Sequence, residues 1–235
     1  MPLYSKMTTR LRCLTLLTSI LWSFMAVAQT PPNNIEIENY RGLFRAVLEH
    51  DTSRLNQLLS SDVDIDQRDG HGRSALHVAA YFQNHAAMRL LVAAGADANA
   101  LEGDFYDIVT IAAVADDLAT LKLALTLGCR SDNVTSRYDG TALIAAAHLG
   151  HFVIVRTLIQ AGAPLDHINN LNWTAVIEAI VLGDGGQKHL ATLRALVDAG
   201  ADVNLADGSG STPLQLARAR GYQDMVDILL AAGAK

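Results

Sequence analysis

A short segment recurs along the chain from Ser74 onward, and this repetition constrains the fold more than any other feature of the sequence. Each copy begins with Ser, Thr or Asp, and the copies start 33 to 38 residues apart, at Ser74, Asp107, Thr141, Thr174 and Thr212. A glycine keeps the same period, at Gly95, Gly128, Gly162, Gly200 and Gly233. Two markers that advance together over five units predict a solenoid of stacked units, a class of protein that usually binds rather than catalyses.

Each unit predicts two short helices joined by a turn. The Ser, Thr or Asp that opens the unit can accept hydrogen bonds from the first free N–H groups of a helix, and Pro213 suits a first helical position. An Ala-rich run such as residues 75–81 follows, and then a second run with helical spacing, for example Met88, Leu91 and Val92. The repeated glycine fits the residue just past the second helix, where a left-handed backbone is common.

These units resemble the ankyrin repeat. The resemblance rests on Ser-Ala-Leu-His-Val-Ala-Ala at 74–80, on Gly150-His151 and on Ala-Gly-Ala-Asp-Ala-Asn at 94–99. It implies an all-α ankyrin-repeat solenoid of helix-turn-helix units with β-turn fingers. Six repeats are expected over residues 39–235, at 39–68, 69–101, 102–135, 136–168, 169–206 and 207–235. The glycine-rich surplus of the fifth repeat, residues 183–189, is expected to lengthen the loop between its two helices.

The first 28 residues have the pattern of a secretory signal peptide. A basic start with Lys6, Arg10 and Arg12 precedes an apolar run at 14–25 and the small residues 26–28. Cleavage after Ala28 would place the protein in the periplasm or outside the cell. The alternative is a retained membrane anchor, although the apolar run is shorter than the roughly 20 residues that spanning requires. Residues 29–38, which contain two adjacent prolines, are expected to form a flexible leader.

Charge and cysteine content narrow the choice of partner. Without residues 1–28 the chain keeps 15 basic and all 24 acidic residues, a net charge of about −9. An acidic solenoid is a poor match for nucleic acid, whose phosphates require a basic surface. Cys129 is then the only cysteine, so no internal disulfide is expected, and we expect its side chain to pack as a small apolar group.

The sequence contains no recognisable catalytic motif. A Gly-rich phosphate loop, a Cys-x-x-Cys pair and a nucleophile elbow are all missing, so we expect a protein that is not an enzyme and has no cofactor. His77 and His151 match positions that serve structure in the ankyrin family, through hydrogen bonds within and between repeats. His148 and His151 lie three residues apart and could hold a metal or a small ligand, but no third ligand of fixed spacing accompanies them.

The resemblance also implies a binding surface, because ankyrin proteins usually bind partners through their fingers and the exposed face of the first helix of each repeat. Large side chains occur at two finger positions and at late positions of the first helices. Aromatic residues accompanied by arginine are typical of interface hot spots. The candidate partner-binding residues are Arg73, Tyr81, Tyr106, Tyr138, His148 and Trp173.

The expected function is that of an exported, monomeric, non-catalytic adaptor that holds another protein on its concave face. Its acidic charge favours basic or neutral partners. The chain also resembles periplasmic ankyrin proteins of bacteria, some of which are associated with catalases and peroxide tolerance. One alternative is therefore a stabiliser or chaperone of a single periplasmic enzyme, such as a catalase. A second alternative is metal or small-ligand binding through His148 and His151.

Overall fold

The computed structural model describes residues 29–235, so the expected signal peptide lies outside the described residues. Residues 31–235 form one compact unit that contains thirteen helices and no β-strand. The helices are Asn34–Asn39 (α1), Gly42–Leu48 (α2), Thr52–Leu59 (α3), Ala75–Tyr81 (α4), His85–Ala93 (α5), Ile108–Val114 (α6), Leu118–Thr126 (α7), Ala142–His148 (α8), Phe152–Gln160 (α9), Ala175–Val181 (α10), Gln187–Asp198 (α11), Pro213–Ala219 (α12) and Gln223–Ala231 (α13). The expected all-α class is confirmed.

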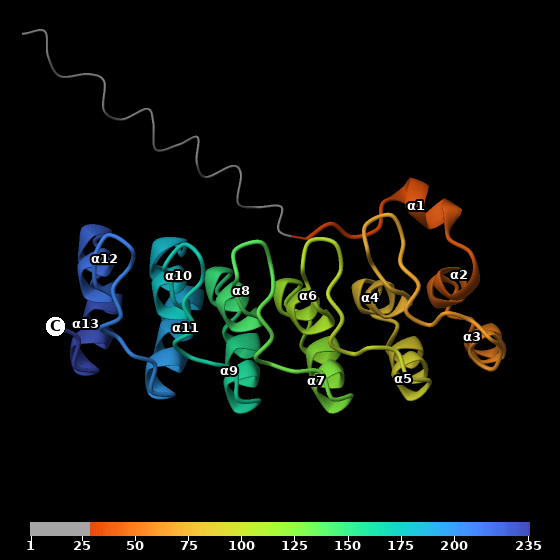
Figure 1. Cartoon of the computed structure of the whole chain (residues 1–235). Helices are drawn as coiled ribbons and strands as arrows, with labels where there is room; N and C mark the ends of the chain where they lie inside the picture. The colour runs from red at the N-terminus through yellow and green to blue at the C-terminus, as the bar shows by residue number, and fades with distance from the viewer. Residues whose placement is uncertain (1–28) are drawn as a thin grey trace, which may run out of the picture. The chain divides into compact units, whose positions relative to one another are not determined.

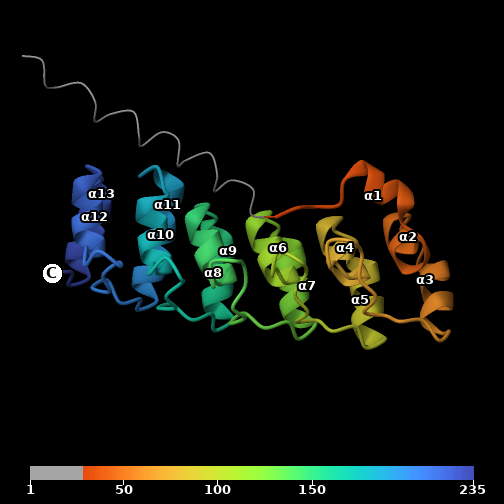
Figure 2. The same cartoon turned by 45° about the horizontal axis from the view of Figure 1, so that its top comes forward.

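Helices α2 to α13 form six antiparallel pairs that stack in two rows (Figures 1 and 2). The inner helices α2, α4, α6, α8, α10 and α12 each pack against the next one in the row, and each also packs against its own outer helix. The outer row consists of α3, α5, α7, α9, α11 and α13. A loop that projects from each junction between successive pairs forms a finger. Packing is therefore between nearest neighbours, which is the arrangement of a solenoid.

The ends of the helices match the expected local signals. Inner helices α4, α6, α8, α10 and α12 begin directly after the Ser, Thr or Asp that opens each repeat. Asp107 and Thr141, for example, accept a hydrogen bond from the backbone N–H of Thr110 and of Ile144. Gly95, just past α5, has a φ of +101°, a left-handed conformation that other residues adopt at a cost. The residue that opens each repeat therefore marks where these inner helices begin.

Small residues set the spacing of the inner row. One position is alanine in all five of these helices and is fully buried, at Ala79, Ala112, Ala146, Ala179 and Ala217. A larger side chain there would push neighbouring helices apart, because protein interiors have few voids to absorb added volume. Leucines of the outer helices, such as Leu91 and Leu158, fill the space between the two rows and are fully buried.

The segment expected as a flexible leader is helical in its second half. Asn33 accepts hydrogen bonds from the N–H groups of Ile35 and Glu36, and the Glu36 carboxylate accepts one from the N–H of Asn33. This reciprocal pair is a capping box, and it starts α1. The prolines led to the expectation of flexibility, but the Asn followed by a Glu three residues later was the stronger signal.

The loop formed by the glycine-rich stretch 183–189 is shorter than expected, because the helix begins within this stretch. Helix α11 begins at Gln187 and has 12 residues, whereas α5, α7, α9 and α13 have 9. The turn before it is closed by Asp184, whose carboxylate accepts hydrogen bonds from the Gly186 N–H and from the ring of His189. Part of the surplus thus adds length to the helix, and Asp184 holds the turn that leads into it.

Two further observations concern the described residues alone. No helix in residues 29–235 has both the length and the apolar content that crossing a bilayer requires. Cys129, which follows α7, is buried as expected, and burial raises the pKa of its thiol to about 12. The thiol is therefore protonated at neutral pH, and the side chain acts as a small apolar group.

Candidate partner-binding face

Four fingers are each held by one polar residue at the base. The side chain of that residue accepts hydrogen bonds from the backbone N–H groups two and four residues further on, and this pattern recurs at Asp69, Glu102, Asn169 and Asp207. Backbone hydrogen bonds then join successive fingers, from the Gly103 N–H to the His71 carbonyl at 2.8 Å and from the Asn170 N–H to the Tyr138 carbonyl at 2.9 Å. The fingers are thus ordered before any partner arrives, which lowers the entropic cost of binding.

Two of the expected binding residues are buried, and their assignment is corrected here. The Arg73 side chain is fully buried, and its guanidinium pairs with Glu36 at 2.6 Å and with Asp69 at 2.7 Å. Tyr106 occupies the same finger position in the next repeat and is only 5% exposed. Both side chains are buried, so neither offers a surface to a partner.

The other four candidates are partly or fully accessible. Tyr138, at 42% exposed, lies at a finger and is the most open of them. Trp173, Tyr81 and His148 are half-buried. The hydroxyl of Tyr81 is buried without a hydrogen-bond partner, so burial raises its pKa. The structure therefore places Tyr138 on the accessible surface, whereas only part of each of the other three side chains is exposed to solvent.

Sequence analysis overlooked a row of exposed apolar residues at the fingers. The residue immediately before the first polar residue of three successive fingers is apolar and exposed: Leu101 at 37%, Val134 at 48% and Ile168 at 48%. Phe105, which lies in the same finger as Leu101, is 53% exposed. The available signal was the register, since one position carries Leu, Val and Ile in consecutive repeats. We call these four residues and Tyr138 the finger face.

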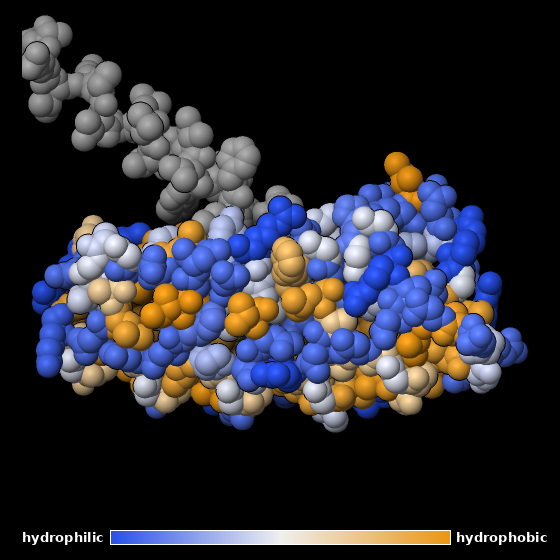
Figure 3. Space-filling view, viewed as in Figure 1, coloured by the Kyte–Doolittle hydropathy of each residue, from blue (hydrophilic) through white to orange (hydrophobic). Residues whose placement is uncertain are grey.

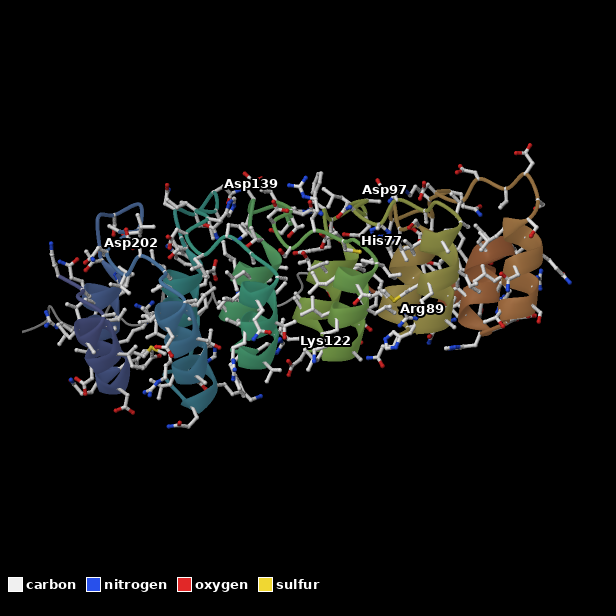
Figure 4. All side chains as sticks on the ribbon, turned by 90° about the horizontal axis from the view of Figure 1, so that it is seen from below. His77, Arg89, Asp97, Lys122, Asp139 and Asp202 are labelled. Carbon is white, nitrogen blue, oxygen red and sulfur yellow. The ribbon has the colours of Figure 1, made fainter. Side chains whose placement is uncertain are left out.

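Polar groups surround these apolar ones. Figure 3 shows separate apolar patches along the repeats, with hydrophilic groups between them. In Figure 4 the exposed acids Asp97, Asp139 and Asp202 lie along the loops at the finger edge, whereas Arg89 and Lys122 lie on the outer helices. The finger edge therefore carries much of the negative charge, and a basic or neutral partner suits it better than an acidic one.

A buried carboxylate lies on the inner row beside His148. Glu178 of α10 is 4% exposed, and its Oε1 accepts a hydrogen bond of 3.0 Å from the Asn169 side chain. Its Oε2 has no hydrogen-bond partner, and the nearest ring nitrogen, Nδ1 of His148, is 3.5 Å away. Burial raises the pKa of Glu178 to about 7, while the bond from Asn169 acts in the opposite direction. Burial and the nearby His189 lower the pKa of His148.

The pKa of Glu178 leads to a prediction about stability. Because its folded pKa is above the unfolded value, the stability that it contributes is fully present below about pH 4.5 and is lost as pH rises through 7. Between pH 5 and 8 this loss amounts to about 2–3 kcal/mol for a group buried to this extent. The variant Glu178→Gln should lack that decline. Denaturant unfolding of both proteins at pH 5, 6, 7 and 8 measures it, and parallel curves would contradict the assignment.

The histidines proposed as metal ligands make other contacts. Nδ1 of His151 hydrogen-bonds to the carbonyl of Ala113 at 3.0 Å, which links two repeats. His77 bonds through Nδ1 to the Ser74 hydroxyl at 2.8 Å and through Nε2 to the Ala100 carbonyl at 3.0 Å. Both observations agree with the structural roles expected of these residues. Within residues 29–235 no group of three or more His, Cys, Asp or Glu side chains could hold a metal ion.

Comparison with known proteins identifies the class. The family model for ankyrin repeats in three copies matches residues 109–207, and the model for the single ankyrin repeat matches residues 71–102 and 209–235. The chain belongs to the ankyrin repeat family, and an ankyrin repeat domain is a protein–protein interaction module. The family expected from the sequence is thereby confirmed.

The chain is also similar to individual ankyrin repeat proteins. The chain is 35% identical to the ankyrin repeat protein YahD of Escherichia coli (strain K12) over 80% of this chain and 94% of YahD. A crystal structure of an ankyrin repeat domain from Acinetobacter baumannii AYE matches with 44% identity and a TM-score of 0.77, covering 82% of this chain and 98% of the other. The ankyrin repeat domain of Bcl-3, a member of the IκB protein family, matches with 25% identity and a TM-score of 0.74, over 83% and 87%.

Proposed function

We propose that this protein is an exported, monomeric, non-catalytic adaptor that binds a partner protein through its finger face. The observation that carries this proposal is the row of exposed apolar side chains on fingers that are already ordered by hydrogen bonds. When a partner docks on such a patch, little conformational entropy is lost in the fingers, and apolar area is buried. Export rests on the signal-peptide pattern of residues 1–28.

Removing apolar area from the finger face should abolish binding without affecting folding. The double variant Tyr138→Ala/Ile168→Ala deletes two side chains that are 42% and 48% exposed, so the thermal midpoint should stay within a few degrees of the wild type. Binding of the partner captured from a periplasmic extract should weaken at least tenfold, as is usual for hot-spot residues.

The matched control is Phe152→Ala, which removes an aromatic side chain that is 38% exposed on the outer helix α9. This control should bind normally. Equal weakening by the control and the double variant would show that the finger face has no special role. A partner enzyme that loses activity without the protein, although its location is unchanged, would identify the stabiliser role instead of the adaptor.

A further inference from the structure

Glu178 is the exception at its position in the repeat. The corresponding residues of the other inner helices from α4 onward are apolar: Val78, Ile111, Ala145 and Leu216. Burying a carboxylate without pairing its charge is costly, and such groups are usually paired or neutralised. Glu178 has one oxygen bonded to Asn169 and the other, Oε2, without any hydrogen-bond partner. The fold therefore keeps an unpaired acceptor at a position where an apolar residue would serve packing better.

The unpaired oxygen is covered by a side chain that can move. His148, on the neighbouring helix α8, is 32% exposed in its side chain and has no hydrogen bond to its ring, apart from the 3.5 Å approach to Oε2. Rotamer changes of partly exposed side chains are fast, so the ring can turn aside and open the carboxylate to a group from outside.

We propose that Glu178 and His148 form the receptor for one basic side chain, a lysine or an arginine, of the protein partner. This proposal rests on the proposed function, because it names the chemistry that the adaptor recognises. An ammonium or guanidinium group supplies the donor that Oε2 lacks and compensates its charge, and an imidazole ring beside it can take part of the apolar stem. A metal ion fits less well, since the described residues offer no third ligand.

Other charged groups near the receptor are held by hydrogen bonds of their own. His189 of α11 hydrogen-bonds through Nε2 to the backbone carbonyl of His148 and through Nδ1 to Asp184. Arg220, which follows α12, donates to the Val181 carbonyl at the end of α10. Neither provides a hydrogen bond to Oε2. A bound cation favours the ionised carboxylate, so binding releases a proton. Affinity should therefore rise about tenfold from pH 6 to pH 8.

The test uses a displayed library of random 12-residue peptides, selected on the intact protein at pH 8. Selected peptides should share one Lys or Arg position. Replacing that residue by norleucine should weaken binding to the wild type about 30-fold or more, as for a buried charge pair, and binding to Glu178→Gln by only a few fold. The control Asp198→Asn removes an exposed charge from the outer helix α11 and should behave as the wild type. In the wild-type complex, nuclear magnetic resonance should show the pKa of Glu178 lowered.

The outcomes separate the two proposals. Peptides that bind the finger face and are blocked by Tyr138→Ala/Ile168→Ala, but share no basic position, would overturn the receptor and leave the adaptor intact. Equal losses on the wild type and on Glu178→Gln would do the same. Failure of the wild type to select any peptide, together with failure to capture any protein, would overturn both. A decrease in affinity from pH 6 to pH 8 would also contradict the receptor.

Discussion

Replacing Arg73 with alanine should lower the free energy of unfolding of the N-terminal repeats by about 3–5 kcal/mol, the usual cost of removing one partner from a buried ion pair. The Arg73 guanidinium is fully buried between Glu36 of α1 and Asp69 of the first finger. Asp69 also accepts a hydrogen bond of 2.5 Å from the Tyr40 hydroxyl. Removing the arginine takes the buried cation away from both carboxylates, and His71 remains beside Glu36 at 3.0 Å.

The damage should concentrate at one end of the stack, because contacts in a solenoid connect neighbours only. Hydrogen exchange should therefore accelerate in α1 and α2 far more than in α10 or α12. Denaturant unfolding and exchange of the same variant measure both effects. The triple variant Arg73→Met/Glu36→Gln/Asp69→Asn should recover part of the loss, since it removes the uncompensated charges as well as the cation.

Arg130 supplies the matched control. It also pairs with a carboxylate, that of Asp132 at 2.8 Å, but both side chains are about half exposed or more, so Arg130→Ala should leave unfolding unchanged within error. If Arg73→Ala proved as mild as Arg130→Ala, the buried pair would contribute nothing to the stability of the N-terminal repeats.

Acid should destabilise the protein through His77. Burial, helped by the positive charge of Arg68, lowers the pKa of His77 from 6.5 to about 4, although the hydrogen bond to the Ala100 carbonyl acts in the opposite direction. A lowered folded pKa gives stability that is present above pH 6.5 and is lost as pH falls through 4. The loss between pH 7.5 and pH 4 is about 3 kcal/mol for this residue.

The variant His77→Gln tests this assignment, because it cannot titrate. It should be less stable than the wild type by about 2–3 kcal/mol at pH 7.5, where two buried hydrogen bonds are disturbed. The difference should shrink towards zero near pH 4, since only the wild type is penalised by acid. Denaturant midpoints at both pH values measure it. A constant difference across the range would show that the pKa of His77 is the same in the folded and the unfolded protein.

Local chemistry made much of the fold predictable. The capping residues, the alanines of the inner helices and the left-handed glycines act within a few residues of their own position, so each repeat could be located from its sequence. The helical second half of the leader and the short loop before α11 were both missed because nearby proline or glycine outweighed a local polar signal. That signal is the capping box of Asn33 in the first case and the hydrogen bond that Asp184 accepts from the Gly186 N–H in the second.

The exposure of the binding residues was harder to predict, because it depends on which side chains the neighbouring segments place against them. Tyr138 was found from its register and is exposed, whereas Arg73, also a finger residue, is buried and pairs with Glu36, 37 residues earlier in the chain. Leu101, Val134 and Ile168 were missed, since an apolar residue in a loop has no local mark of being exposed.

The sequence by itself determined the repeat, its helices and the family, because periodicity and capping are properties of short segments. Only the tertiary structure decided which finger residues reach solvent and why the pKa of Glu178 is raised. Burial within the stack raises the pKa of Glu178, and Arg73 is buried where Glu36, from a segment 37 residues earlier, and Asp69 both pair with it. Burial and charge pairing act through space, and no pattern along the chain records them.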